Sequence, residues 1–273
     1  MPLSRRCLLA GLVTSATAAY AAPARAAPRE LGVPARAKDA ESASALAEGW
    51  ADLPHEKIEA AMVEQVLAGN VPDRLRTLEP VDVSQRGGAK ITLWVSRDYL
   101  AVGDDHDFMT LRLTGPDAEA LAQKLGGWLP TPHIVNGIYR TGCKLVSPGL
   151  GEKPHVQWFD QARRYDALVE KRQNDGAGTL HAGHFKDIVA TPALMRHPGR
   201  LAIYGLHDSS GTPTQPISLF HRDVYVDYIQ GTRLVSNEVE LDGEPLTLVE
   251  LLADHPEGRH LCSGARLELP VYS

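Results

Sequence analysis

Near residue 180 the arrangement of apolar residues changes from mainly helical spacing to short strand-like runs. Before this point the spacing predicts helices over 56–67, 116–125, 131–146 and 158–171, with one strand pair over 90–102 and 109–113. After it, strands are predicted over 180–190, 200–206, 215–220, 224–228 and 232–235. This division predicts an α+β fold, in which a helical N-terminal half packs on a mostly antiparallel β-sheet in the C-terminal half.

The amino terminus carries Arg5-Arg6 directly ahead of an apolar, alanine-rich run over 8–22. The run is too short and too weakly apolar for a resting membrane span, which needs about 20 residues, so it predicts a signal peptide. Ala24-Arg25-Ala26 supplies a small-x-small cleavage site, and we expect residues 1–26 to be removed. The arginine pair resembles a twin-arginine signal, with an ordinary Sec signal as the alternative. The expected location is the periplasm or the exterior.

The remaining chain is expected to form one domain. Residues 27–45 are rich in Ala, Pro, Arg and Ser without an apolar period, which predicts a flexible tether. No comparable linker, internal repeat or second long apolar run follows, so residues 46–273 are expected to be a single α+β domain without a transmembrane segment.

The charge of the mature chain argues against a nucleic-acid partner. Loss of residues 1–26 removes three arginines and no acids, which leaves 25 basic against 34 acidic residues, a formal charge of about −9. A polyanion attracts clustered Lys and Arg, whereas the basic residues here are scattered among acids. The expected partner is instead a cell-envelope polymer or peptide.

Two cysteines, Cys143 and Cys262, remain after Cys7 leaves with the signal peptide. In an oxidising compartment they could form a disulfide, and the sequence leaves this open. Cys143 could instead be the nucleophile of an NlpC/P60-like cysteine peptidase, with a histidine on a following strand as base. Against this, Cys143 is predicted late in the helix over 131–146, whereas reactive thiols usually lie at a helix amino end. The sequence therefore favours a packed or bridged cysteine.

Histidines locate the candidate chemistry, because five of the eleven fall between residues 181 and 221. Histidine exchanges protons near neutral pH and is also the commonest metal ligand. On a straight strand over 180–190, His184 and Lys186 would share one face and Asp187 the other. We expect one site formed by His184, Lys186, Asp187, His221, Asp227, Tyr228 and Arg233. His207 is expected in a surface turn, at the end of a hairpin over 200–221.

Four short motifs carry a resemblance to a known family. They are Ala182-Gly183-His184-x-Lys186-Asp187, Ile203-Tyr204-Gly205-x-His207, Gln215-Pro216 and Tyr225-x-Asp227-Tyr228-x-x-Gly231-x-Arg233-Leu234. From about Val71 to Asp254 the chain resembles a family of exported bacterial proteins of unassigned activity. A histidine is frequent there at the position of Gln230, so the resemblance implies that this chain lacks a proton-transfer group or uses glutamine instead. It implies no substrate and no cofactor.

Two classes of function remain, since the Gly-x-Ser-x-Gly, His-Glu-x-x-His and glycine-rich phosphate-loop motifs are all absent. The first is a periplasmic or secreted hydrolase of envelope material such as peptidoglycan peptides. In it His184 and His221 would be acid/base groups or metal ligands, Asp227 would orient one histidine, and Lys186 or Arg233 would stabilise negative charge. The second is a non-catalytic, envelope-associated domain that binds an anionic or carbohydrate ligand. Metal dependence stays open.

One further carboxylate group lies in the turn between the two strands of the first pair. Asp104, Asp105 and Asp107 are spaced as ligands for a hard cation such as calcium. The alternative, which we favour, is a solvated hairpin turn.

Overall fold

The computed structural model describes residues 26–148, 158–174 and 180–272 of the 273-residue chain. The expected signal peptide lies outside the described residues except for Ala26. Within the described ranges, no helix is both long and apolar enough to cross a membrane.

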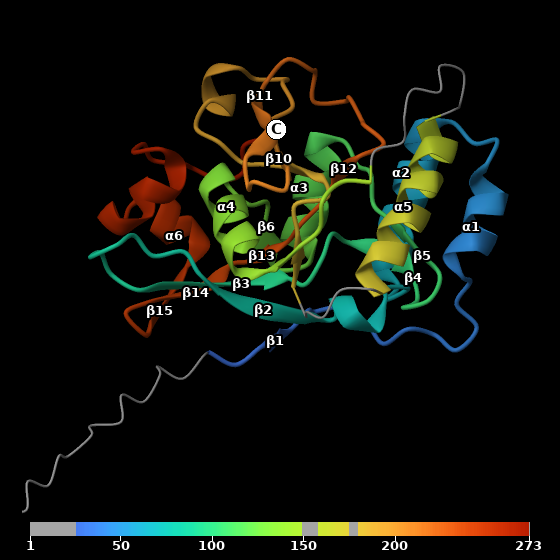
Figure 1. Ribbon diagram of the computed structural model, residues 1–273, viewed down its shortest axis with the longest axis horizontal. Helices are drawn as coiled ribbons and strands as arrows, with labels where there is room; N and C mark the ends of the chain where they lie inside the picture. Colours follow the sequence, from blue (N-terminus) through green and yellow to red (C-terminus); the bar gives the residue numbers. More distant parts are fainter. Residues whose placement is uncertain (1–25, 149–157, 175–179, 273) are drawn as a thin grey trace, which may run out of the picture.

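Helices and mostly antiparallel strands are both present, which confirms an α+β fold (Figure 1). The helices are α1 (Ala43–Trp50), α2 (His55–Leu67), η1 (Asp73–Leu75), α3 (Gly115–Lys124), α4 (Pro132–Thr141), α5 (Trp158–Asn174), η2 (Leu194–Arg196), α6 (Leu248–Ala253) and η3 (Pro256–Cys262). The strands are β1 (Arg29–Glu30), β2 (Thr77–Asp82), β3 (Ile91–Ser96), β4 (Ala101–Gly103), β5 (Phe108–Thr110), β6 (Gly127–Trp128), β7 (Cys143–Lys144), β8 (His181–Ala182), β9 (Lys186–Ile188), β10 (Ile203–His207), β11 (Pro213–Ser218), β12 (Gln230–Gly231), β13 (Val235–Ser236), β14 (Glu238–Leu241) and β15 (Glu244–Thr247).

The main sheet joins distant parts of the chain. Its order is β1-β2-β3-β13-β6, and β14 pairs with both β3 and β15. All these pairings are antiparallel. Every residue of β3 is buried, so this strand needs partners on both edges, and β2 supplies only one of them. The expected division into a helical first half and a β-sheet second half is therefore not confirmed, because the sheet takes strands from both.

A second sheet, in the order β11-β10-β9-β12, carries part of the predicted site. β10 and β11 confirm the predicted hairpin, and β12 adds parallel to β9. The strand predicted over 180–190 is broken at Gly183, whose φ of 99° lies in the left-handed region that favours glycine. A Cβ there would lie 2.7 Å from the Tyr139 ring. The break separates β8, which pairs parallel with β7, from β9.

The helices fall into two groups. α3 and α4 contact strands of the main sheet, whereas α1, α2 and α5 lie together at the other end of the domain, against β4 and β5 (Figure 1). Thr114 and Thr131 cap α3 and α4, each followed by proline in the first turn, so these starts are confirmed. α4 ends at Thr141, earlier than the predicted residue 146. The backbone of Gly142 is extended, and the N–H of Cys143 is donated to Leu180 O instead of to a helical carbonyl.

The prediction of a flexible tether over 27–45 is wrong. Arg29–Glu30 forms β1 on β2, and Leu31 is buried in the core. The Arg29 guanidinium lies 3.3 Å from the centroid of the Trp94 ring, and Trp94 Nε1 donates to Ala27 O at 2.7 Å. The segment is ordered because it covers an aromatic side chain of β3. Helix α1 also begins inside the predicted tether.

The strand predicted over 224–228 is absent as well. Asp227 Oδ1 accepts the N–H of Ile229, and the N–H of Gln230 is donated to Asp227 O. These local hydrogen bonds fold the segment into a turn instead of a strand. The extended backbone resumes only with β12.

Candidate functional site

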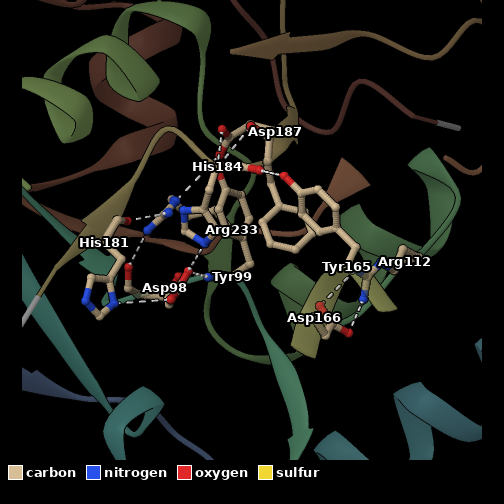
Figure 2. A network of polar contacts seen from close by, with 11 residues as sticks. Asp98, Tyr99, Arg112, Tyr165, Asp166, His181, His184, Asp187 and Arg233 are labelled. Carbon is tan, nitrogen blue, oxygen red and sulfur yellow. Dashed lines mark hydrogen bonds and ion pairs between the residues drawn. The ribbon is translucent and has the colours of Figure 1, made fainter. Parts of the chain in front are cut away.

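Six buried polar and aromatic side chains lie close together, and we name them the Asp98 cluster (Figure 2). Its members are Asp98, Tyr99, His181, His184, Asp187 and Arg233. They come from the β3–β4 turn, from β8, from the β8–β9 connection, from β9, and from the residues between β12 and β13.

The Asp98 carboxylate contacts both imidazoles of the cluster. Its Oδ2 lies 3.3 Å from His181 Nδ1, and its Oδ1 lies 3.3 Å from His184 Nε2. Oδ1 also accepts the Tyr99 N–H at 2.8 Å. Burial alone would raise the pKa of Asp98, but His184, the contact with His181 and the charge of Arg233 outweigh it and hold this pKa well below its usual range. The carboxylate is therefore ionised at neutral pH and can orient both rings.

The two histidines differ in access to the surface. His184 is 1% exposed and packs edge-on against Tyr99 and Phe185, with ring centroids 5.2 and 5.0 Å away. His181 lies at the edge of the cluster, and its Nε2 is buried without a hydrogen-bond partner among the described residues. Figure 2 shows this second nitrogen turned away from Asp98. His184 Nδ1 is likewise buried without a hydrogen-bond partner among the described residues, so the two histidines differ mainly in exposure, 9% for His181 against 1% for His184.

Arg233 and Asp187 form the other half of the cluster. Arg233 donates to Ser96 O at 2.9 Å and to His181 O at 2.8 Å, and its Nε lies 3.5 Å from Asp187 Oδ1. Tyr99 donates its hydroxyl to Asp187 Oδ2 at 2.8 Å. Burial raises the pKa of Asp187 to about 6, although Arg233 and Tyr99 lower it in part. Arg233 therefore fixes the backbone that carries His181.

Lys186 and Asp227 form an ion pair beside this cluster, with both side chains partly buried. Lys186 and Asp187 are neighbours on β9 and point to opposite faces. His184 lies in neither β8 nor β9, so the face that it would share with Lys186 on one continuous strand is not defined. The expectation of a shared face assumed a straight strand, and Gly183 breaks that strand.

Tyr228 packs next to a second buried ion pair. Its ring meets Tyr165 edge-on at 6.2 Å, and its carbonyl accepts from Arg112 Nε at 3.0 Å. Arg112 is fully buried and binds Asp166 with two hydrogen bonds, of 2.6 and 2.9 Å. Tyr165 donates its hydroxyl to the carbonyl of His184, which links this pair to the Asp98 cluster (Figure 2).

His221 has a set of contacts different from those of His184 and Asp227. Its ring stacks on Tyr225 at 3.7 Å and meets Phe220 edge-on, and its carbonyl accepts the N–H of Leu201. Among the described residues, no hydrogen bond, ion pair or ring contact joins His221 to His184 or Asp227.

His207 is buried, so the expectation of a surface turn residue is wrong. Its Nε2 lies 3.2 Å from Asn136 Oδ1, and its ring stacks on Tyr139 at 4.1 Å. The turn begins one residue later, where Asp208 Oδ1 accepts two backbone N–H groups of the loop. Helix α4 supplies both partners of His207, and it could not be placed against this hairpin from sequence.

Sequence reasoning missed Asp98 and Arg112, although each leaves a local trace. Asp98 interrupts the apolar run over 90–102, and Arg112 stands between Leu111 and Leu113. A charged side chain inside a buried strand-like run must be paired. That signal indicates a partner without naming it.

No set of three or more His, Cys, Asp or Glu side chains in the described ranges is arranged to hold a metal ion. The carboxylates of the β4–β5 turn accept protein donors: Asp104 from backbone N–H groups of its own loop, Asp105 from Arg74, and Asp107 from Ser44. These hydrogen bonds are those of a structured turn.

The cysteines do not form a disulfide. Both are free thiols, with Cys262 buried in η3 and Cys143 partly exposed on β7. Burial raises the pKa of the Cys262 thiol to about 12, which makes it unreactive at neutral pH. The placement of Cys143 late in a helix is wrong, since α4 ends two residues before it.

No protein-family model, no curated protein and no solved structure matches this chain. An ionised carboxylate that holds an imidazole with a second, unpartnered nitrogen is an arrangement suited to proton transfer.

Proposed function

We propose that this protein is an exported hydrolase that acts on cell-envelope peptide material, with His181 as the proton-transfer group and Asp98 as its orienting carboxylate. The contact between Asp98 Oδ2 and His181 Nδ1 carries this proposal. A carboxylate at Nδ1 favours the tautomer with its proton on that nitrogen, so Nε2 is left to accept a proton from a nucleophile.

The remaining cluster residues support His181 in this proposal. Arg233 holds the His181 carbonyl and the Ser96 carbonyl, and so fixes the position of the base. His184 is a second imidazole on the same carboxylate, with Nε2 3.3 Å from Asp98 Oδ1, and helps to hold Asp98 in place. In this proposal His181 takes the acid/base role expected for His184 and His221, and Asp98 takes the orienting role expected for Asp227.

The substrate class rests on the predicted export signal and on composition. An exported, acidic chain without clustered basic residues meets envelope polymers rather than nucleic acid. Peptide cross-links of the envelope offer amide bonds, whose cleavage needs a base at the attacking group and an acid at the leaving amine. One histidine can serve both steps.

The test is hydrolysis of purified peptidoglycan fragments, measured as the release of free amines. We expect the wild-type protein to release amines and the His181→Gln variant to be about 100-fold slower or worse, as losses of acid/base groups commonly are. His106→Ala is the matched control, because this imidazole is exposed in the β4–β5 turn. Full turnover by a folded His181→Gln protein, or no amine release by wild type, would refute the proposal.

A second candidate function is a non-catalytic binding domain, and a cleft of about 460 Å³ favours it. The cleft lies between α1, β5 and α5, and charged side chains of both signs line it, including Arg163, Arg164, Asp160 and Glu170. Such a surface suits a peptide or sugar acid with mixed charges. Calorimetric binding of peptidoglycan fragments that is lost in an Arg163→Ala, Arg164→Ala variant, without turnover, would favour this candidate.

A further inference from the structure

Cys143 and His181 are direct partners in the parallel pair β7–β8. The Cys143 N–H is donated to Leu180 O at 2.7 Å, and the Leu145 N–H to Ala182 O at 2.8 Å. Neighbouring strands lie about 4.8 Å apart, and residues paired in a parallel ladder project to the same face. The thiol of Cys143 and the imidazole of His181 therefore stand side by side.

Small residues on both sides of the pair allow this close approach. A Cβ at Gly142 would lie 2.9 Å from Leu180 O, and a Cβ at Gly183 would lie 3.1 Å from Leu145 O. A larger side chain at either position would push β7 away from β8. The register of the thiol against the imidazole is thus set by the backbone and not by a chance rotamer.

Cys143, His181 and Asp98 have the chemical types of a nucleophile, a base and a carboxylate that orients the base. Cys143 is partly exposed, His181 is 9% exposed, and Asp98 is 4% exposed. The Asp98 carboxylate contacts Nδ1 of His181, while Nε2 has no hydrogen-bond partner in the described part of the protein. A buried polar nitrogen without a partner is costly, and a neighbouring thiol would satisfy it.

We propose that Cys143 is the nucleophile of this hydrolase, with His181 as its base and Asp98 as the residue that positions His181. The inference rests on the function proposed above and adds the nucleophilic atom, the sulfur of Cys143. No hydrogen bond joins the thiol to Nε2 in the described part of the protein, so the proposal requires the Cys143 side chain to turn to another staggered rotamer before it can reach Nε2.

The reaction then runs through a thioester. The thiol proton moves to His181 Nε2 as a sulfur lone pair bonds to the carbonyl carbon of the substrate amide, and the C=O π electrons move to oxygen. When the carbonyl re-forms, the C–N bond breaks and the amine leaves with the proton from Nε2. Water next attacks the thioester and gives its proton to Nε2, the C–S bond breaks, and sulfur recovers a proton. One amide and one water are consumed.

Thiol alkylation of the full-length protein tests the pair without any substrate. Iodoacetamide is reacted at pH 6, and peptide mass spectrometry follows each cysteine separately. We expect Cys143 to react about 10-fold faster than free cysteine, because proton transfer to an imidazole raises the thiolate fraction more than it lowers nucleophilicity. Cys262 is the internal control for a buried thiol and should remain unmodified.

The variants decide between a reactive pair and a merely exposed thiol. In His181→Gln the Cys143 rate at pH 6 should fall to that of free cysteine, whereas in His106→Ala it should be unchanged. Equal Cys143 rates in wild type and His181→Gln would overturn the proposed pair.

Turnover separates this inference from the proposed function. If the wild-type protein hydrolyses envelope fragments and a folded Cys143→Ala variant does so equally well, the nucleophile is not Cys143, and His181 activates water instead. If the thiol shows His181-dependent reactivity but no fragment is hydrolysed, the envelope substrate is wrong and the thiol–imidazole pair stands. Loss of turnover in folded Cys143→Ala, with alkylation dependent on His181, supports both.

Discussion

Replacement of Asp98 by asparagine should destabilise the protein through the buried charges that it leaves behind. Asp98 is 4% exposed and lies 3.3 Å from each of two imidazoles, with Arg233 close enough to lower its pKa. Asparagine keeps the shape and can still accept the N–H of Tyr99, so the change removes mainly the charge. Removing one partner of a buried charge pair costs about 3–5 kcal/mol.

We expect about 3 kcal/mol for Asp98→Asn, the lower end of this range, because Arg233 keeps Asp187 as a neighbour at 3.5 Å. In a domain of this size each kcal/mol lowers the melting temperature by about 2–4 °C, so the variant should melt about 6–12 °C lower. Urea unfolding followed by far-UV circular dichroism gives the free energy directly. Asp105→Asn, at an exposed ion pair with Arg74, is the control and should cost about 0.5 kcal/mol or less.

The pH dependence gives a second, independent check. The pKa of Asp98 is depressed in the folded state, so its stabilisation is complete above the unfolded value of about 3.9 and is lost as the pH falls below it. Between pH 5 and pH 3 the wild-type protein should lose about 1.2 kcal/mol that the variant does not lose. A free-energy difference that stays constant over this interval, or one near zero at pH 7, would refute the argument.

Three further outcomes are expected. Asp166→Asn leaves the buried Arg112 without its partner and should cost about 3–5 kcal/mol in urea unfolding; a cost below about 1 kcal/mol would contradict the pairing. Because burial raises the pKa of Asp187 to about 6, the wild type should lose stability as the pH rises from about 4 to 6, and Asp187→Asn should abolish that loss in the same assay. Replacement of Arg5-Arg6 by lysines should leave precursor in the cytoplasm on immunoblots, whereas normal export would indicate the Sec route.

Local signals in the sequence predicted local structure well. Thr114 and Thr131, each followed closely by proline, predicted the starts of two helices, and both starts are confirmed. The hairpin over 200–221 was predicted from its turn residues and is confirmed as β10 and β11. Such features depend on hydrogen bonds between residues a few positions apart, which the sequence displays directly.

Features that depend on contacts between residues far apart in the sequence could not be predicted from it. The end of α4 at Thr141 depends on β7 pairing with β8, which is nearly 40 residues later in the sequence. Because of the same pairing, Cys143 lies on β7 opposite His181 and not in the helix predicted over 131–146. The partner of Asp98 could not be named for the same reason, since His181 lies on another element brought near by tertiary packing.

The central position of β3 has a consequence for how the chain reaches its folded state. One edge of β3 pairs with β2, which is close by in the sequence. The other edge pairs with β13 and β14, which are synthesised much later. The hydrogen bond from Arg233 to Ser96 O likewise joins residues 137 positions apart. Until those late strands pair with it, this edge of a strand that is fully buried in the native fold is open to pairing with other chains. Folding should therefore be slow and concentration-sensitive, and a chaperone that shields residues 91–96 should raise the yield more than one that acts on the helices.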